Sequence, residues 1–502
     1  MTMDRSLFHR VYDAGHLIEE VPFCDPLSVF AAVAREPFAL LLDSATATPD
    51  QDPSLQGRWT YVAADPFTVL TKRQGQTCLN GIRQNVGALE RLDQQVNALA
   101  LAPNWPDEEW LPPFTGGLAG MFGYELAQEL EQLPAPPQQT SDGEQTPDLA
   151  VGAYDCILAF DCVERRAFII STGLPEMSPT ARAVRAEARA SKWRARLALN
   201  PALPDLKWPE LPAPMSAVHA EHTRKAYEDR IQRVIDYIFA GDIFQANLSQ
   251  RFTATLQNGD DAFTLYRKLR AISPAPFAGF FNFETGYLLS SSPERFLKTD
   301  GSAVETKPIK GTRPRGATAE EDRTLAQDLL DSEKDNAENV MIVDLLRNDL
   351  SRVSEDGSVK VTRLCELESF ATVHHLVSTI KSKLRADQTN VELLKACFPG
   401  GSITGAPKVR AMEIISELEA TARGPYCGSL GYLSFSGAMD TNILIRSMTC
   451  IGESISFRAG GGIVADSKPS DEYRETLDKA AALSDAIRGA APEVSNVLQA
   501  RA

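Results

Sequence analysis

The spacing of apolar residues divides the chain into helical and strand-like segments. Between residues 223 and 241, Ile231, Val234, Ile235 and Ile238 recur at helical spacing, with Thr223 placed as an N-cap. This pattern predicts a helix that ends near residue 240. Three segments instead concentrate apolar and β-branched residues and predict strands: FALLLDS (38–44), TYVAADPFTVL (60–70) and LAVGAYDCILAF (149–160).

Two proline-rich stretches interrupt these elements. The segment 133–148 is expected to be a surface loop, and the segment 200–217 is expected to connect two regions. We therefore divide the chain into an N-terminal domain (1–200), a linker (201–218), a C-terminal domain (219–490) and a tail (491–502). No repeat of fixed period occurs, and clustered strands broken by helices predict an α+β fold.

Composition and charge narrow the class of protein. The 502 residues carry a formal net charge of −16, which argues against nucleic-acid or anionic-membrane partners, because such partners require clustered Lys and Arg. No signal peptide and no apolar stretch of membrane-spanning length is evident, so we expect a cytoplasmic protein. The eight cysteines are scattered and suggest neither a zinc site nor a disulfide framework.

Several segments carry candidate chemistry. The segment ETKPIKGTRPRG (305–316) gathers cations around Lys310, and SSPERF (291–296) places Glu294 near a strand end just upstream. Two predicted helices each carry carboxylates three residues apart, a spacing that puts both on one helical face and suits Mg²⁺. These pairs are Asp335 with Glu338, and Glu472 with Glu475, the latter followed by Lys479.

Near the C-terminus, the run Gly460, Gly461 and Gly462 would let backbone N–H groups approach an anion closely. The run is no dinucleotide fingerprint, since GxGxxG is absent. Arg446 falls in a segment with strand-like alternation and could offer a bidentate contact to a carboxylate.

Taken in order, FQANLSQRF, SSPERF, PIKGT, AENVMIVDLLRND, GGSITGAPKVRAMEII, GYLSFSG, DTNILIRS, RAGGGIVADS and EYRETLDKA resemble the chorismate-utilising enzymes. That family includes anthranilate, aminodeoxychorismate, isochorismate and salicylate synthases. The resemblance covers roughly residues 220–490. It implies large antiparallel sheets packed as a sandwich-like core and flanked by helices.

The resemblance also implies roles for individual residues. Glu338 and Glu475 would bind Mg²⁺ directly, with Asp335 and Glu472 assisting through water, and the metal would hold the ring carboxylate of chorismate. Three residues would line the ring: Thr312, His375 and Ser402. The remaining contacts would hold carboxylates: Tyr426, Arg446, the amides of Gly460, Gly461 and Gly462, and Lys479. In LLDS (41–44), Asp43 and Ser44 resemble a tryptophan-binding segment, although relatives in the folate branch keep such a pocket without regulation.

Two positions distinguish branches of the family. Water-using branches carry a lysine base where this chain has Gln245, so water is not expected as the nucleophile. Aminodeoxychorismate synthases carry a lysine at the position of Lys310, where anthranilate synthases usually have alanine. We therefore expect amination at ring carbon 4, with Lys310 as the nucleophile at carbon 2 and Glu294 as the general acid.

No glutaminase motif is recognisable in the sequence, so ammonia is expected from a separate glutamine amidotransferase subunit. Two alternatives remain. Anthranilate synthase component I would use the same substrates, and a non-catalytic regulator would have the same fold but lack a metal ligand or the acid.

Overall fold

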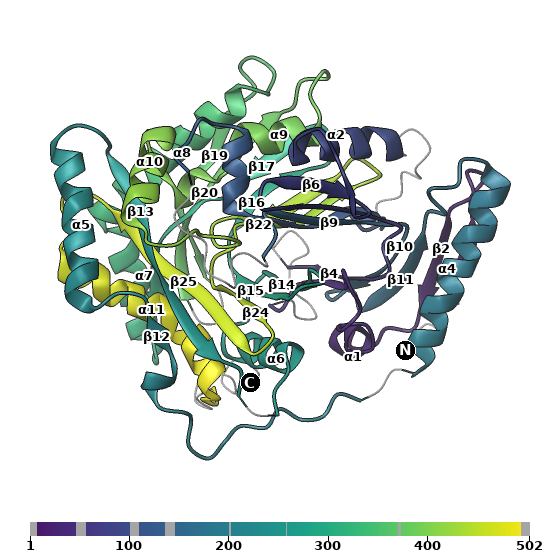
Figure 1. Cartoon of the computed structure of the whole chain (residues 1–502), viewed down its shortest axis with the longest axis horizontal. Helices are drawn as coiled ribbons and strands as arrows, with labels where there is room; N and C mark the ends of the chain where they lie inside the picture. The colour runs from purple at the N-terminus through teal and green to yellow at the C-terminus, as the bar shows by residue number, and fades with distance from the viewer. Residues whose placement is uncertain are drawn as a thin grey trace.

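The computed structural model describes residues 8–46, 57–100, 110–135, 146–199, 202–257, 259–369 and 373–492. Within these residues two large antiparallel sheets form the framework (Figure 1). The first sheet runs in the order β1 (His9–Val11), β2 (Leu17–Val21), β11 (Arg166–Ser171), β10 (Cys156–Asp161), β4 (Trp59–Ala63), β3 (Leu40–Asp43), β14 (Phe277–Asn282), β15 (Tyr287–Ser292), β24 (Ser447–Ile451), β25 (Ser454–Ile463), β13 (Gln245–Thr255) and β12 (His219–Ala220), and β21 (Gly405–Ala406) also pairs with β13.

The second sheet has its own order of antiparallel strands. It runs β18 (Ile309–Pro314), β20 (Val373–Lys383), β17 (Ala303–Thr306), β16 (Arg295–Thr299), β23 (Met439–Asn442), β22 (Ser429–Ser434), β8 (Gly117–Phe122), β9 (Leu149–Tyr154), β5 (Thr68–Arg73), β6 (Gln76–Leu79) and β7 (Ile82–Arg83), and β19 (Lys360–Ser369) also pairs with β20.

Strands from both halves of the sequence share each sheet. In the first sheet β3 pairs with β14, and in the second β8 pairs with β22. The boundary near residue 218 therefore divides the sequence but does not divide the sheets. One hydrophobic core, which includes Leu40, Tyr61, Met121 and Leu430, lies between the two sheets. The α+β sandwich expected from the resemblance is confirmed.

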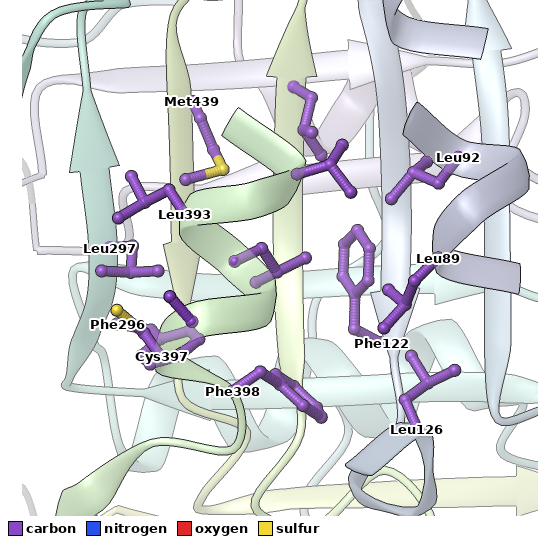
Figure 2. Packing of buried hydrophobic residues seen from close by; sticks show 14 of the residues in the cluster. Leu89, Leu92, Phe122, Leu126, Phe296, Leu297, Leu393, Cys397, Phe398 and Met439 are labelled. Atoms are coloured by element: carbon purple, nitrogen blue, oxygen red, sulfur yellow. The ribbon is translucent and has the colours of Figure 1, made fainter. Parts of the chain in front are cut away.

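Helices cover the outer faces of the sandwich. They are α1 (Pro26–Ala31), α2 (Ala88–Leu99), α4 (Pro179–Leu199), α5 (Arg224–Phe239), α6 (Ala262–Ile272), α7 (Ala319–Leu330), α8 (Glu333–Ser351), α9 (Asn390–Cys397), α10 (Lys408–Leu418) and α11 (Pro469–Arg488), with 3₁₀ turns η2 (Tyr124–Glu129), η3 (Met215–Ala217) and η4 (Gly401–Ile403). Figure 2 shows how α2 and α9 pack: Leu89, Leu92, Leu393 and Cys397 meet side chains of the second sheet, including Phe122. No helix in the described ranges combines the length and apolar character needed to cross a membrane.

The helix predicted after the linker is α5, and its ends follow the predicted rules. Thr223 Oγ1 accepts a hydrogen bond from the backbone N–H of Ala226, and Gly241 adopts a φ of +85° just beyond the helix. Figure 1 shows α5 and α11 alongside the long strands β13 and β25. These two strands carry Gln245 and the glycine run, so the helices fix one wall of the candidate site.

Candidate active site

Lys310 lies on β18 beside a bulge. The pairing of β18 with β20 shifts register between Lys310 and Thr312, and Gly311 between them has a φ of +78°. A Cβ at Gly311 would lie 2.7 Å from Leu329 Cδ1 and 2.9 Å from Asp335 Cγ. Glycine is therefore needed at position 311, because another residue would be strained at this positive φ and its Cβ would clash. The bulge also determines how the Lys310 side chain is oriented relative to that of Thr312.

Glu294 occupies the short connection between β15 and β16, as the sequence predicted. Its side chain is buried, with 4% exposed, and burial raises its pKa to about 7. Hydrogen bonds from Ser402 and the Ile309 backbone oppose this rise, as do the charges of Lys310 and Lys479. At neutral pH a substantial fraction of Glu294 is protonated, which is the form a general acid needs.

The four carboxylates proposed as metal ligands project from α8 and α11, as predicted. Each is paired with a cation. The distances are 2.7 Å for Lys310 to Glu338, 3.4 Å for Arg313 to Asp335, 3.2 Å for Lys334 to Glu472 and 2.6 Å for Lys479 to Glu475. Burial alone would raise the pKa of Glu338, but Lys310 and Lys479 outweigh it, and the pKa is lowered.

The glycine run forms a cradle beneath these carboxylates. A Cβ at Gly462 would lie 2.5 Å from Glu338 Oε1, and a Cβ at Gly461 would lie 3.3 Å from Glu475 Oε1 and 3.5 Å from Glu472 Oε2. An oxygen-only donor set over side-chain-free backbone fits Mg²⁺, which also retains waters. Within the described residues, however, no three acidic, His or Cys side chains are assembled closely enough to hold a metal. The carboxylates are held by the cations instead.

Thr312 and His375 come together across β18 and β20. Thr312 Oγ1 lies 2.9 Å from His375 Nδ1, and both residues belong to the set expected around the ring. Burial, followed by the charge of Arg446, lowers the pKa of His375 to about 3. His375 is therefore neutral at physiological pH and serves as a hydrogen-bonding group.

Arg446 differs from its predicted setting. It lies between β23 and β24, outside either strand, with a φ of +50°. The expectation of an alternating strand at this position was wrong, because the chain turns here to pass from one sheet to the other. Its guanidinium has no acidic partner among the residues that the structure describes, and burial lowers its pKa. A half-buried guanidinium without an acidic partner is suited to a carboxylate from the substrate.

The remaining predicted residues approach the site from separate elements. Ser402 lies in η4 and donates to Glu294, and Lys479 Nζ donates to the carbonyl oxygen of Gly460 at 3.1 Å. Tyr426 is buried and lines a cavity of about 60 Å³ with Arg423 and Ser447. Neither Lys310 nor Glu294 is among the residues that line this cavity.

Asp43 and Ser44 lie at the end of β3 and have partners within the chain. Asp43 accepts hydrogen bonds from Tyr266 at 2.7 Å and from Arg270 at 2.6 Å. Ser44 Oγ donates to the carbonyl oxygen of Trp59 at 2.5 Å. Both groups are satisfied without a ligand.

Comparisons with known proteins show the family to which the chain belongs. A family model described as chorismate binding enzyme matches residues 43–485. The chain belongs to the chorismate-binding enzyme family. It is 41% identical to aminodeoxychorismate synthase component 1 of Klebsiella aerogenes over 452 residues, which is 90% of this chain and 94% of that protein.

The chain is also similar to anthranilate synthases and, in its fold, to an isochorismate synthase. Anthranilate synthase component 1 of Thermus thermophilus is 37% identical over 464 residues, covering 92% of this chain and 95% of that protein. The structure of anthranilate synthase component I from Streptococcus pneumoniae matches with a TM-score of 0.74 and 32% identity, over 87% of this chain and 95% of that chain. The menaquinone-specific isochorismate synthase of Escherichia coli shares the fold, with a TM-score of 0.68 at 19% identity over 94% of this chain and 95% of that chain.

A buried ion cluster was missed from the sequence. Glu419 binds Arg423 at 2.8 Å and Arg458 at 3.0 Å, and all three side chains are at most 4% exposed. Arg423 also donates to the carbonyl oxygen of Ile403 at 3.0 Å, next to Ser402. The cluster thereby ties the Ser402 turn to the strand that carries Gly460. In the sequence, only Arg458, two residues before the glycine run, could have pointed to this cluster.

Proposed function

We propose that this chain converts chorismate and ammonia into 4-amino-4-deoxychorismate, the aminating step towards 4-aminobenzoate. The observation that carries the proposal is the position of Lys310. Its amine lies 2.7 Å from Glu338 and close enough to Glu294 to affect the pKa of that carboxyl. Displacement of the ring hydroxyl requires a nucleophile and, beside it, a carboxyl that can donate a proton.

The chemistry assigned to the chain's own residues has two parts. Glu294 gives its proton to the hydroxyl that leaves ring carbon 4, while the Lys310 amine bonds to carbon 2. Because only the free amine is nucleophilic, the ion pair between Lys310 and Glu338 has to open before this attack. Lys307 and Arg313, the neighbouring cations in sequence, are occupied by Glu368 at 2.6 Å and Asp328 at 2.6 Å.

Substrate recognition is assigned to groups around these two residues. Arg446 offers a guanidinium without an acidic partner, and those backbone amides of Gly460, Gly461 and Gly462 that do not pair with β13 are assigned to the carboxylates of chorismate. Tyr426 and Lys479 complete this side, while Thr312, His375 and Ser402 face the ring. Local cations of this kind allow an acidic protein to bind a dianion.

We assign Mg²⁺ to Glu338 and Glu475, with Asp335 and Glu472 holding its waters. When bound, the metal supplies positive charge next to the ring carboxylate. The glycine cradle and the oxygen donors support this assignment.

Ammonia is assigned to a separate glutamine amidotransferase subunit. The designation component 1 in the relatives supports a partner subunit. Tryptophan remains a candidate ligand at Asp43 and Ser44, although it would have to displace Arg270 and Tyr266. Calorimetric titration with tryptophan tests this: an Asp43→Asn variant should lose the heat of binding and keep its rate of amination.

The decisive experiment identifies the product. The purified chain is incubated with chorismate, Mg²⁺ and an ammonium salt, and the product is analysed by mass spectrometry. We expect one added amine with the enolpyruvyl group retained, and its loss in Lys310→Ala. The matched control is Lys225→Ala, an exposed lysine on α5 that should leave the rate unchanged. Anthranilate and pyruvate from the wild-type protein would refute the proposal and favour the relatives with anthranilate synthase activity.

A further inference from the structure

The turn from Arg423 to Tyr426 lies between α10 and β22 and ends on a residue assigned to chorismate. The N–H of Tyr426 donates to the carbonyl oxygen of Arg423 at 3.2 Å and closes the turn. Three further hydrogen bonds connect this turn with η2, an element from the N-terminal half of the chain. The N–H of Tyr124 donates to the carbonyl oxygen of Gly424 at 2.8 Å. The Glu125 carboxylate accepts from the N–H of Arg423 at 2.8 Å and from the N–H of Gly424 at 2.9 Å.

The space around the turn leaves these hydrogen bonds as the main restraint on its backbone. A cavity of about 60 Å³ lies against Pro425 and Tyr426, a second of about 30 Å³ lies against Arg423, and Glu125 borders both. Apart from its neighbours in the chain, a Cβ at Gly424 would have no heavy atom within 4 Å. Since dispersion contacts need partner atoms at close range, packing restrains this turn less than a filled core would. The two oxygens of Glu125, a residue that is 9% exposed, hold the turn instead.

The turn leads to two residues of the chorismate site. Tyr426 belongs to it, and the Arg423 guanidinium lies 5.7 Å from the centre of the Tyr426 ring. The same guanidinium donates to the carbonyl oxygen of Ile403 at 3.0 Å, and Ser402, the preceding residue, donates to Glu294. A shift of the Arg423 backbone therefore moves the supports of Tyr426 and of Ser402 together.

We infer that Glu125 is a positioning residue of the amination site, which holds the Arg423–Tyr426 turn where chorismate binds, and this inference rests on the proposed function. An ionised carboxylate can accept a hydrogen bond on each oxygen. An amide of the same shape has one acceptor oxygen and would turn an NH₂ group towards the second backbone N–H. Glu125 acts through the turn and not on the reacting atoms. The N-terminal half of the chain thereby contributes to substrate binding, because misplaced substrate contacts weaken both binding and catalysis.

The test compares Glu125→Gln with Glu129→Gln, a matched control in the same 3₁₀ turn. Glu129 also accepts two backbone hydrogen bonds, from Ala88 at 2.9 Å and from Leu89 at 3.0 Å, but these belong to α2, which carries none of the residues assigned to substrate or metal. Burial, followed by the charge of Asp148, raises the pKa of Glu125 to about 7. The assays are therefore run at about pH 8, where this carboxylate is mostly ionised. Urea unfolding measures the stability of each variant.

A second pair of variants disturbs the turn without changing Glu125. Gly424 has a φ of +60°, and Gly452, in the connection between β24 and β25, has a φ of +58°. At either position an added Cβ would have no heavy atom within 4 Å outside its neighbours in the chain. Alanine is therefore strained at both positions and collides at neither. Only Gly424→Ala strains the turn that carries Tyr426.

We expect Glu125→Gln to lower kcat/KM for chorismate about tenfold, the scale of one lost hydrogen bond to a charged group. The Kd for chorismate, measured by calorimetric titration, should rise by a similar factor, while the KM for ammonia stays at its wild-type value. Gly424→Ala should shift both chorismate constants in the same direction. Glu129→Gln and Gly452→Ala should leave these constants unchanged, even where they lower stability.

Two results would overturn the inference. One is a set of chorismate constants that is the same in Glu125→Gln and wild type. The other is an equal loss in Glu125→Gln and Glu129→Gln, which would show that both carboxylates only stabilise the fold. A wild type that forms no aminated product would overturn the proposed function. In that case a Kd for chorismate that rises in Glu125→Gln and not in Glu129→Gln would still support the positioning role.

Discussion

Replacement of Glu294 by glutamine should stabilise the fold at alkaline pH while it removes activity. Burial raises the pKa of Glu294 from an ordinary 4.5 to about 7, so the folded protein holds this proton more tightly than the unfolded chain. The stabilisation is complete below the unfolded pKa and is lost as pH rises through the folded pKa. The shift corresponds to about 3 kcal/mol. Glutamine has no proton to lose and avoids this loss.

The assay compares the thermal midpoints of wild type and Glu294→Gln between pH 5.5 and 8.5, above the isoelectric point near 5.0. Between these two pH values the unfolding free energy of wild type should fall by about 2 kcal/mol relative to that of Glu294→Gln. For a chain of this length the unfolding entropy is roughly 1 kcal/mol per kelvin, so the variant should gain about 2 °C relative to wild type. Its kcat should fall about 10²-fold to 10⁴-fold.

The control is Glu392→Gln on α9, where the replaced side chain is 41% exposed and pairs with Lys395. Parallel curves for Glu294→Gln and wild type would refute the reasoning, because a carboxyl that titrates alike in both states cannot make stability depend on pH. A loss of activity without this divergence would leave Glu294 important but would contradict burial as the cause of its proton affinity.

Three further outcomes follow from the structure. Gly462→Ala should lower kcat/KM about a hundredfold, because its added methyl group would lie 2.1 Å from a neighbouring atom. Gly461→Ala should lower it far less, because its nearest neighbour would be 3.3 Å away. Similar losses for the two variants in steady-state assays would contradict this reasoning. Helix α7 buries only Leu329 and is held by charge pairs, so hydrogen exchange in α7 should rise with salt more than in α8, and equal protection would argue against ionic attachment. Thr223→Ala should destabilise the protein by about 1 kcal/mol in urea unfolding, and no change would mean that the cap is dispensable.

Local patterns in the sequence predicted the separate parts of the site well. The i, i+3 carboxylates do lie on helices α8 and α11, and Glu294 does lie at a strand end. These features depend on a few neighbouring residues, whose periodicity fixes which face a side chain occupies. The family resemblance added the sandwich fold, which the structural neighbours confirm.

The partners of those residues could not be predicted in the same way. Lys307 and Arg313 are near Lys310 in sequence, but they pair with Glu368 and with Asp328 instead of acting on the Lys310 amine. Lys310 itself pairs with Glu338 on another element. Each of these ion pairs depends on which strands and helices pack against one another in the folded protein.

The sequence by itself determined the family, the elements and the chemical types of the site residues, because motifs and periodicity are local properties of the chain. Only the tertiary structure decided the protonation of Glu294 and the unpaired state of Arg446 and of the Gln245 amide oxygen. The residues that bury a side chain or bond to it come from segments far apart in the chain. Strand β13, which carries Gln245, lies in its sheet between β12, which begins at residue 219, and β25, which begins at residue 454. These long-range contacts determine how strongly each side chain is desolvated and which polar groups have no hydrogen-bond partner, and both properties govern the chemistry of the site.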